Sequence, residues 1–410
     1  MVVISGAEAN KFLFSNEEKF FTRWRPPTVQ NLFPSMEIVR IEHDHKKGKK
    51  YVSFFFKSDM RKKLVATIDC IARNQLQNLC QNGKENETLE VYPLSNIYSF
   101  EIACKLFMSI DDPKDLSDLL YHFNTLNKGL LTLHVNFPGM PFYRAIKAGE
   151  KLREKIGLII KERKDALAAN LVSPNQDILT HMIAVPDDNG EFMSALEISD
   201  KIVSFIIGGY HTTSSTITYA IKYLAQMPHI YDQVKKEQME ISKSMKLEEG
   251  LGWDEVQKMK YASNVVSEVL RHRSILQVAF RETTADITYK GFTIPKGWKI
   301  CWSPPATHKD PKYFEEPRNF DPSRFEGRGP SPYTFVPFGI GPRMCPGYDL
   351  SRVMSIIFLH YWFKLFNWEL ILPHEKDKIW ELILPHEKDK IYVTPIPVQG
   401  LPVRISPINN

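Results

Sequence analysis

The sequence predicts a mainly α-helical fold with small β-sheets, and three observations support this. Long segments carry apolar residues at helical spacing, as at Leu64, Ile68 and Ile71. The segment 277–301 alternates apolar and polar residues and contains turn signals, which is typical of short strands. No Gly/Ser-rich or Pro-rich linker divides the 410 residues, so we expect a single domain over 1–410 rather than the two or three that length alone suggests.

Six segments are predicted to be helices, because apolar residues recur on one face of each. They cover residues 59–80, 91–108, 144–169, 198–227, 253–273 and 348–366. The segment 198–227 is the most apolar of them. We expect Gly208-Gly209 to interrupt it, because glycine weakens a helix interior, and Pro228 to end it, because proline is tolerated only in a first turn.

Strands and loops are predicted elsewhere. The residues VVIS near the start and the tail from 391 have the composition of strands. Residues 174–198 mix Asp, Asn, Pro and Gly, which predicts loops. Residues 302–346 contain ten prolines and four glycines, which predicts a meandering coil.

One segment is repeated. The twelve residues WELILPHEKDKI at 368–379 recur without a mismatch at 380–391. Twelve residues are too few for a repeat of the solenoid type. We therefore interpret 380–391 as a tandem duplicate of 368–379 that carries no chemistry of its own.

Composition excludes several classes of protein. A formal charge of +5 is too weak to predict nucleic-acid binding, although a basic face would suit an acidic protein partner. The five cysteines are widely spaced and form no C-x-x-C pair, which argues against a zinc site or a disulfide framework. No apolar run reaches the roughly 18 residues of a membrane span, and the first residues carry no signal peptide.

The strongest chemical signal is FGIGPRMCPG at 338–347, directly before a predicted helix. Cys345 lies where that helix begins, and the N–H groups and dipole of a helix N-terminus stabilise an anion and lower the pKa of a thiol. Gly339, Gly341 and Gly347 allow the backbone to turn tightly and to approach a flat cofactor closely.

Two further residues of this loop suit a cofactor. Phe338 is placed to pack against a ring and keep water from the sulfur, and Arg343 to pair with a carboxylate at the cofactor edge. A lone cysteine in a Gly-Pro loop would usually be structural. The ten-residue pattern instead favours a thiolate on haem iron, which donates electron density and favours O–O cleavage.

The pattern F-x-x-G-x-R-x-C-x-G resembles the haem-binding signature of the cytochrome P450 monooxygenases, and the resemblance covers almost the whole chain. It implies the P450 fold and a haem b whose iron is bound by Cys345. It also implies electrons from NADPH through a reductase, and O2 as the oxidant. Family members carry a membrane helix, a hinge and a first helix and strand before the segment MVVISG, so we expect the fold to be incomplete at the N-terminus.

Two charged motifs fall in the order of the family. Glu268 and Arg271 are three residues apart on a predicted helix, where they would otherwise form an ordinary surface ion pair. The resemblance implies a structural network completed by Arg324. It also implies that Arg281 binds a haem propionate, for which a surface cation is the alternative.

The motif GGYHTT at 208–213 resembles the family's oxygen-activation motif. The resemblance implies that Thr212 donates a hydrogen bond to the oxygen and helps to deliver protons. The alternative is a helical threonine bonded to its own backbone. His211 stands where the family has an acid. Because histidine titrates near neutrality, slower proton delivery and uncoupling to peroxide are both open.

The segments NKFLFSNE at 10–17, FPGMPFYRAIKAG at 137–149 and GFTIPKGWKI at 291–300 resemble the plant terpenoid oxidases of the family. Within them the resemblance is to oxidases of pentacyclic triterpenes such as β-amyrin at C-28, with conifer taxoid hydroxylases as the alternative. The implied substrate pocket is lined by Phe205, Gly209, Val278, Ala279 and Phe280. His272, Arg273, Ser274 and Ile275 replace a family turn rich in proline, which would loosen the link to the strand of Arg281.

Three functions remain open. The first is a monooxygenase that inserts one oxygen atom from O2 into a terpenoid C–H bond. The second is a catalytically impaired member, favoured by the N-terminal start, His211 and the duplication. The third is a haem–thiolate isomerase or peroxide-using enzyme. We expect a monomer that binds a hydrophobic terpenoid and the reductase but no nucleic acid. By resemblance it would lie at the cytosolic face of the endoplasmic reticulum membrane, although this chain lacks the anchor.

Overall fold

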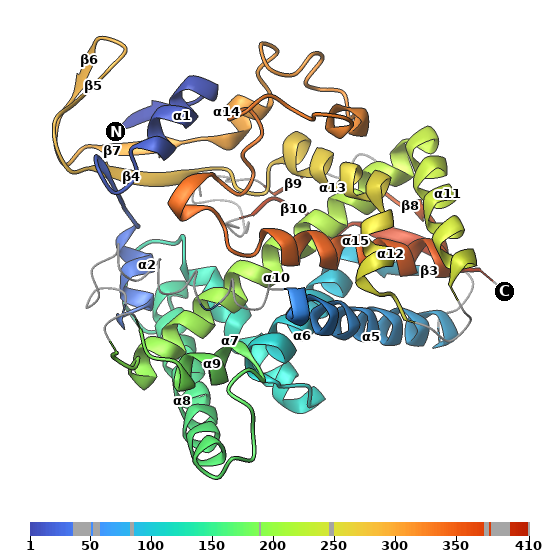
Figure 1. The fold of residues 1–410 in the computed structure, drawn as a ribbon, viewed down its shortest axis with the longest axis horizontal. Coiled ribbons are helices and arrows are strands. Elements are labelled where there is room, and N and C mark those ends of the chain that lie inside the picture. The colour runs from blue at the N-terminus through green and yellow to red at the C-terminus, as the bar shows by residue number, and fades with distance from the viewer. Residues whose placement is uncertain are drawn as a thin grey trace.

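The computed structural model describes residues 1–35, 51, 58–82, 86–187, 190–245, 250–372, 377–378 and 394–408. The described chain is mainly helical, with small sheets, as the sequence predicted (Figure 1). The second copy of the repeat, 380–391, lies outside the described residues, so its interpretation stays a prediction.

Helices form most of the described chain. The α-helices are α1 (Ala7–Ser15), α2 (Pro27–Leu32), α5 (Ser58–Asn82), α6 (Val91–Met108), α7 (Pro113–Gly129), α8 (Pro141–Ala168), α9 (Ile178–Ala184), α10 (Ala195–Gln226), α11 (Pro228–Ser244), α12 (Trp253–Lys258), α13 (Lys260–Arg273), α14 (Pro304–His308) and α15 (Tyr348–Leu365). The 3₁₀ turns are η1 (Pro322–Phe325) and η2 (Gly341–Arg343).

Helix α10 is the central element, and it runs through the middle of the molecule (Figure 1). It begins with a capping box, in which the Ser194 hydroxyl accepts from the N–H of Glu197 while the Glu197 carboxylate accepts from the N–H of Ser194. It packs against α6, where the Ser95 hydroxyl lies 3.1 Å from that of Thr218. Small hydroxyl side chains at this contact let the two helices approach closely.

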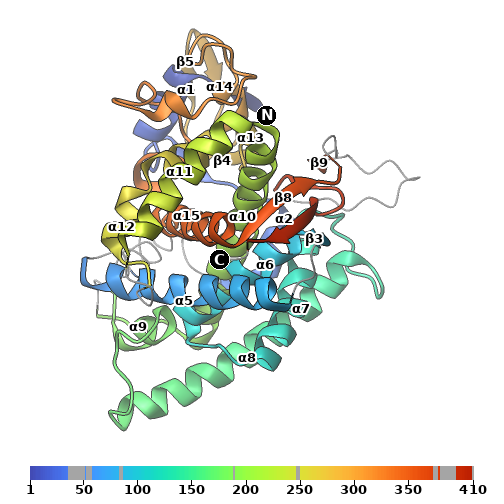
Figure 2. The same cartoon turned by 90° about the vertical axis from the view of Figure 1, so that its right-hand side faces the viewer.

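Helix α15 is buried along most of its length and packs on α5, α10 and α13. Figure 2 shows α5, α10 and α15 stacked in layers between the sheet with β4 at one side and α8 at the other. The hydroxyl of Thr213 donates to that of Ser351 at 3.2 Å, which joins the middle of α10 to the first turn of α15. The segment before α15 is therefore held close to the middle of α10.

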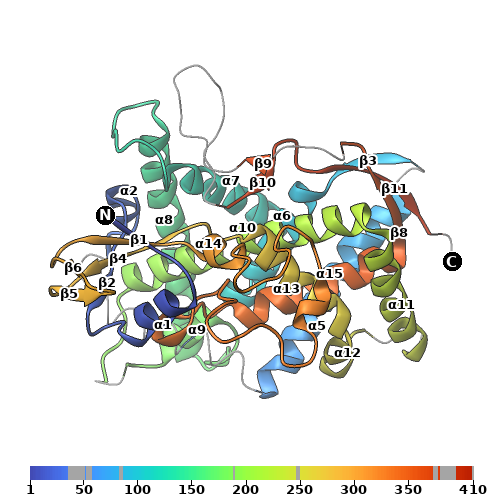
Figure 3. The same ribbon diagram turned by 90° about the horizontal axis from the view of Figure 1, so that it is seen from above.

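The sheets are small. Their strands are β1 (Val2–Ile4), β2 (Phe21–Arg23), β3 (Glu87–Glu90), β4 (Ala279–Thr283), β5 (Ile287–Tyr289), β6 (Phe292–Ile294), β7 (Lys299–Trp302), β8 (Phe366–Leu370), β9 (Asp377–Lys378), β10 (Ile396–Pro397) and β11 (Pro402–Pro407). One sheet has the order β1-β7-β4-β2 and another the order β3-β11-β8. These two sheets lie at opposite ends of α10 (Figure 3).

Two predictions about helices are wrong. Helix α10 runs through Gly208-Gly209 without interruption, because its packing on neighbouring helices outweighs the roughly 1 kcal/mol that each glycine costs. The segment 253–273 is two helices, divided at Met259. The segment 174–198 includes loops as predicted, and between them lies the short helix α9, whose N-cap Asp177 accepts from the N–H of Thr180 at 2.7 Å.

Candidate active site

The cysteine loop closes on itself through backbone hydrogen bonds. The N–H of Cys345 donates to the carbonyl of Phe338 at 2.9 Å. Gly339 and Gly341 have φ values of 69° and 78°, in the left-handed region that favours glycine. At Gly341 a Cβ would also lie 3.3 Å from the carbonyl oxygen of Phe14 in α1. Gly339 and Gly341 are therefore favoured by the turns of the loop, whereas Gly347 has an ordinary φ of −86°.

The sulfur of Cys345 lies just before α15. Its side chain keeps solvent-exposed surface, yet burial within the surrounding protein raises the pKa of the thiol, and a hydrogen bond from the backbone N–H of Gly347 lowers it. The expectation of a lowered thiol pKa is therefore wrong for this protein, because burial outweighs the helix terminus. A coordinated metal ion deprotonates a thiol by itself, so ionisation would accompany metal binding.

The aromatic and basic residues of the loop precede Cys345 in the chain. Phe338 is half-buried and meets the ring of Tyr348 edge to face, with ring centroids 5.0 Å apart. All three guanidinium nitrogens of Arg343 are shielded from solvent. Their roles toward a cofactor stay predictions.

Part of the surface of α10 is open. A Cβ added at Gly208 or Gly209 would meet nothing within 4 Å, although this helix is buried along most of its length. Phe205, Gly209 and Thr212 follow one another at helical spacing, so they share one face with this open space. The hydroxyl of Thr212 donates to the carbonyl of Gly208 at 2.7 Å, which is the self-bonded alternative named for it.

His211 faces α6 instead. Its Nδ1 lies 2.8 Å from the hydroxyl of Tyr92 and 3.3 Å from Nδ2 of Asn96. Because the amide N–H of Asn96 can only donate, Nδ1 accepts and Nε2 carries the hydrogen. Burial lowers the pKa of His211 to about 3. The expectation that it titrates near neutrality is wrong, since the buried imidazole stays neutral.

The other residues predicted to line a substrate pocket lie on or beside β4. Val278, Ala279 and Phe280 are half-buried. The ring of Phe280 meets that of Trp24 edge to face at 5.4 Å. On α10, Phe205 contacts Phe107 in the same manner at 6.3 Å. The assignment of these residues to substrate stays a prediction.

Arg281 on β4 is paired within the protein. Its Nε donates to a carboxylate oxygen of Glu17 at 2.5 Å, and its Nη1 to the carbonyl of Phe280 at 2.9 Å. Glu17 therefore uses some of the hydrogen-bond donors of Arg281, the residue that was predicted to bind a propionate.

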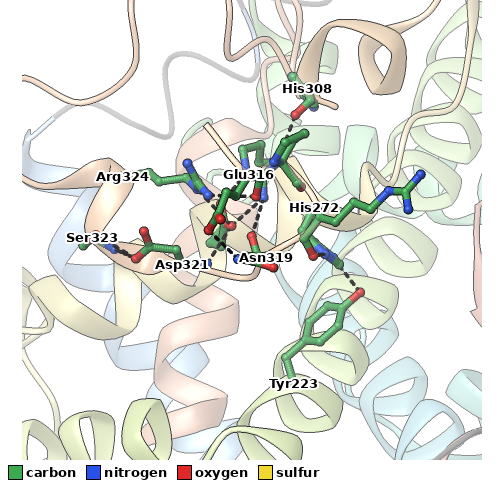
Figure 4. Close-up of polar contacts among 12 residues, drawn as sticks. Tyr223, His272, His308, Glu316, Asn319, Asp321, Ser323 and Arg324 are labelled. Carbon is green, nitrogen blue, oxygen red and sulfur yellow. Dashed lines mark hydrogen bonds and ion pairs between the residues drawn. The ribbon is translucent and has the colours of Figure 1, made fainter. Parts of the chain in front are cut away.

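Glu268, Arg271 and Arg324 lie together. Figure 4 shows Arg324 beside Glu316 and Asp321 of the coil. Both members of the Glu268–Arg271 pair are fully buried, with two N–O distances of 2.6 Å. Arg271 also donates to the carbonyls of His308, Pro317 and Asn319. Arg324 reaches Glu268 at 3.7 Å. The network ties α13 to the meandering coil that leads to Cys345.

The turn after Arg271 is held by side-chain hydrogen bonds, while the expected loosening of its link to the strand of Arg281 stays a prediction. His272 lies 3.0 Å from the hydroxyl of Tyr223 and 2.8 Å from the carbonyl of Arg318 (Figure 4). The hydroxyl of Ser274 lies 2.9 Å from Nδ1 of His308. Histidine and serine side chains thus supply hydrogen bonds in place of a proline turn.

The arrangement fits a haem. An accessible thiol stands at the N-terminus of α15, the open glycine face belongs to the turn of α10 that is bonded to α15, and buried guanidinium nitrogens suit porphyrin carboxylates. Sequence reasoning missed Tyr92 and Asn96, which bind His211 from a distant segment without any motif.

Known proteins resemble this chain along nearly its whole length. The family model described as Cytochrome P450 matches residues 1–393. A beta-amyrin 28-monooxygenase of Saponaria officinalis is 44% identical over 407 residues, which cover 99% of this chain and 81% of the relative. A beta-amyrin 6-beta-monooxygenase of Solanum lycopersicum is 42% identical over 412 residues, which cover 100% of this chain and 83% of that relative.

A solved structure agrees. A cyanobacterial cytochrome P450 with bound retinoic acid superposes with a TM-score of 0.84 at 28% identity, over 99% of this chain and 89% of that one. Among the described residues, no helix is both long enough and apolar enough to span a membrane.

Proposed function

The chain belongs to the cytochrome P450 family, and from this premise we propose that it oxidises a pentacyclic triterpene at a C–H bond, with Cys345 as the iron ligand. Members of this family use haem b and receive electrons from NADPH through a reductase, and the chain is a monooxygenase of this kind. The substrate class is supported by the 44% identity to a beta-amyrin 28-monooxygenase.

The observation that carries the proposal is the cysteine loop. Cys345 presents its sulfur at the N-terminus of α15, with the N–H of Gly347 as a hydrogen-bond donor. When bound, a haem supplies O2 activation at an iron atom whose thiolate ligand favours O–O cleavage. Phe338, next to this loop, would limit the access of water to the sulfur.

Helix α10 would handle protons and substrate. The open face at Gly209 leaves room for an apolar molecule, and Phe205 would form part of its wall. The Thr212 hydroxyl is within one helical turn of this space and donates to the carbonyl of Gly208. It would give up this hydrogen bond to donate one to the O2 molecule that is being activated. His211 would act as a neutral hydrogen-bonding group in the proton path.

The relatives of this chain differ in the carbon atom that they oxidise. Relatives of similar identity are named for oxidation at carbon 28 and at carbon 6 of beta-amyrin. We propose carbon 28 as the target, in keeping with the greater identity. Incubation with β-amyrin, reductase and NADPH, followed by mass spectrometry and NMR of the product, would assign the carbon. A product from a taxane but not from β-amyrin would reject the triterpene.

The iron ligand has its own test. We expect reduced protein with carbon monoxide to show the Soret band of a thiolate ligand, and Cys345→Ala to lose this band, because Cys345 is the cysteine that lies just before α15. Cys301→Ala is the matched control, since Cys301 lies on β7. An unchanged spectrum and haem content in Cys345→Ala would overturn the assignment.

His211 supports a second candidate, a catalytically impaired member. The pKa of the buried His211 imidazole is about 3, so the ring stays neutral at neutral pH and has no proton to pass on as an acid would. NADPH consumption that yields peroxide without product would favour this candidate. Product formed from a hydroperoxide without reductase would instead favour a peroxide-using enzyme. We further propose a monomer at the cytosolic face of the endoplasmic reticulum membrane, in keeping with the family.

A further inference from the structure

Two arginines are directly opposite each other in the four-stranded sheet. Arg23 on the edge strand β2 pairs in register with Arg281 on β4. Opposed residues of antiparallel strands project from the same face with Cβ atoms about 5 Å apart, and like charges there are destabilising. The sheet therefore brings two cations together at a cost that some other interaction must offset.

The carboxylate of Glu17 forms an ion pair with one of these two arginines. Glu17 is buried and binds Arg281 at 2.5 Å through one of its oxygens. Within the part of the chain that the structure describes, the guanidinium of Arg23 forms no hydrogen bond or ion pair with another side chain. Arg23 also keeps exposed surface, so it remains reachable by an anion.

Two more arginines lie nearby and extend the pair to a cluster. We call Arg23, Arg25, Arg281 and Arg343 the arginine cluster. Although part of the Arg23 side chain is exposed, desolvation by the surrounding protein lowers its pKa to about 9, and the positive charges of Arg25, Arg281 and Arg343 lower it further. Burial and the charge of Arg343 also lower the pKa of Arg25. Because like charges repel one another, an anion placed beside Arg23 would be stabilised by this cluster.

The arginine cluster adjoins the cysteine loop. Arg343 lies two residues before Cys345. The same loop approaches α1 at Phe14, where a Cβ on Gly341 would be 3.3 Å from the carbonyl oxygen. Three residues after Phe14 comes Glu17, the partner of Arg281. The arginine cluster is therefore connected to the cysteine loop both through Arg343 and through the contact with α1.

From this geometry we propose that Arg23 is a haem-binding residue, whose guanidinium donates hydrogen bonds to a propionate carboxylate of the porphyrin. Arg25 supplies a second cation next to it, on the chain that leads from β2 to α2. A porphyrin with two carboxylates provides an anionic partner for Arg23, and the planar guanidinium suits bidentate binding of a carboxylate. The inference deepens the proposed function and rests on haem being bound at Cys345.

The test measures haem retention rather than turnover. Holoprotein is mixed with an excess of an apo-globin as haem acceptor, and the rate of haem transfer is followed in the Soret region. We expect Arg23→Gln to release haem about tenfold faster or more, equivalent to roughly 1.4 kcal/mol. Arg23→Lys keeps the charge and should recover most of the retention. Arg404→Gln, which removes an exposed arginine from β11, is the matched control and should change nothing.

The same variants are then loaded with haem dimethyl ester, whose side chains carry no charge. We expect the effect of Arg23→Gln to disappear with this ester. An equal acceleration for both porphyrins would mean a general loosening and would overturn the inference, as would unchanged release of haem. In either case a thiolate Soret band in the unmodified protein would leave the proposed function standing.

Discussion

The imidazole of His211 shows how surroundings decide the chemistry of a side chain. Its sequence neighbours suggest a group that titrates near neutrality, whereas the structure buries it against α6. There Tyr92 and Asn96 both point hydrogen-bond donors at its Nδ1. A site with two donors and no acceptor is better suited to a carboxylate than to a neutral ring.

We therefore predict that His211→Asp improves the catalyst. The new carboxylate would accept both hydrogen bonds and provide a group that holds and releases protons. Product formed per minute should rise by up to roughly 100-fold, the lower end of what a positioned acid contributes, and less peroxide should form per NADPH. Product and peroxide are measured together against NADPH consumption. His211→Asn is the control, because it accepts a hydrogen bond without titrating. Equal values for the two variants would exclude proton delivery as the cause.

Among the helices, α13 depends on a buried ion pair for its connection to the coil. Replacing Arg271 with methionine would leave the carboxylate of Glu268 buried and three carbonyl groups without their donor. We expect a loss of roughly 3–5 kcal/mol of unfolding free energy together with loss of haem, measured by denaturant titration and Soret absorbance.

A second ion pair on the neighbouring helix provides the control for Arg271. Lys258 and Glu255 have the same three-residue spacing on α12, but the lysine is more than half exposed. Lys258→Met should cost less than about 1 kcal/mol. Similar losses in the two variants would show that spacing rather than burial sets the strength of the pair.

Helix α10 carries glycines where an ordinary helix would carry larger residues. A methyl group at Gly209 meets no atom within 4 Å, so Gly209→Ala should stabilise the protein by about 0.5–1 kcal/mol through helix propensity. It should also weaken substrate binding, seen as a smaller spin-state change on titration with β-amyrin. Gly157→Ala on α8, where a Cβ also meets no atom within 4 Å, should raise the unfolding free energy by a similar amount without changing substrate binding. Unchanged substrate binding in Gly209→Ala would remove Gly209 from the pocket.

Over the whole molecule, buried histidines make stability depend on pH. Burial lowers the pKa of His211, His308 and His360 to about 3 each, from an ordinary 6.5. The folded protein keeps them neutral while the unfolded chain binds protons below about pH 6.5. The stability they contribute is fully present above about pH 6.5 and is lost as the pH falls toward about 3. Buried carboxyl groups with raised pKa, such as that of Glu237, act in the opposite direction.

A single substitution isolates one histidine. Nδ1 of His360 lies 2.9 Å from the side-chain oxygen of Gln238, and glutamine at position 360 could keep this hydrogen bond. We expect the loss of unfolding free energy between about pH 7.5 and about pH 5.5 to be smaller by about 1.4 kcal/mol in His360→Gln. Denaturant titrations at the two pH values measure it. An unchanged loss would show that His360 is protonated in the folded protein.

The fold class and the cysteine loop were predictable because their signals are contiguous. Helical spacing identified α5, α6, α8 and α15, and one ten-residue pattern identified Cys345 and its glycines. Helix α7 was missed although Asp112 and Pro113 form an ordinary helix start. The surroundings of His211 could not be predicted, because its partners lie more than 110 residues away along the chain. The position of Arg23 opposite Arg281 could not be predicted either, because it depends on the register of two strands that are far apart in the sequence.

His308 joins the two ends of the coil that precedes the cysteine. The N–H of Val336 donates to the Nε2 of His308 at 2.9 Å, so the segment between these two residues begins and ends at the same place. The distal tip at Gly327 and Gly329 is exposed, and lengthening such a loop costs only about 0.6 kcal/mol per doubling. A peptide tag or reporter domain inserted at this tip should leave the position of the Cys345 sulfur unchanged, because the hydrogen bond at His308 fixes both ends of the segment. The tip is therefore a suitable place to tether the protein to a surface.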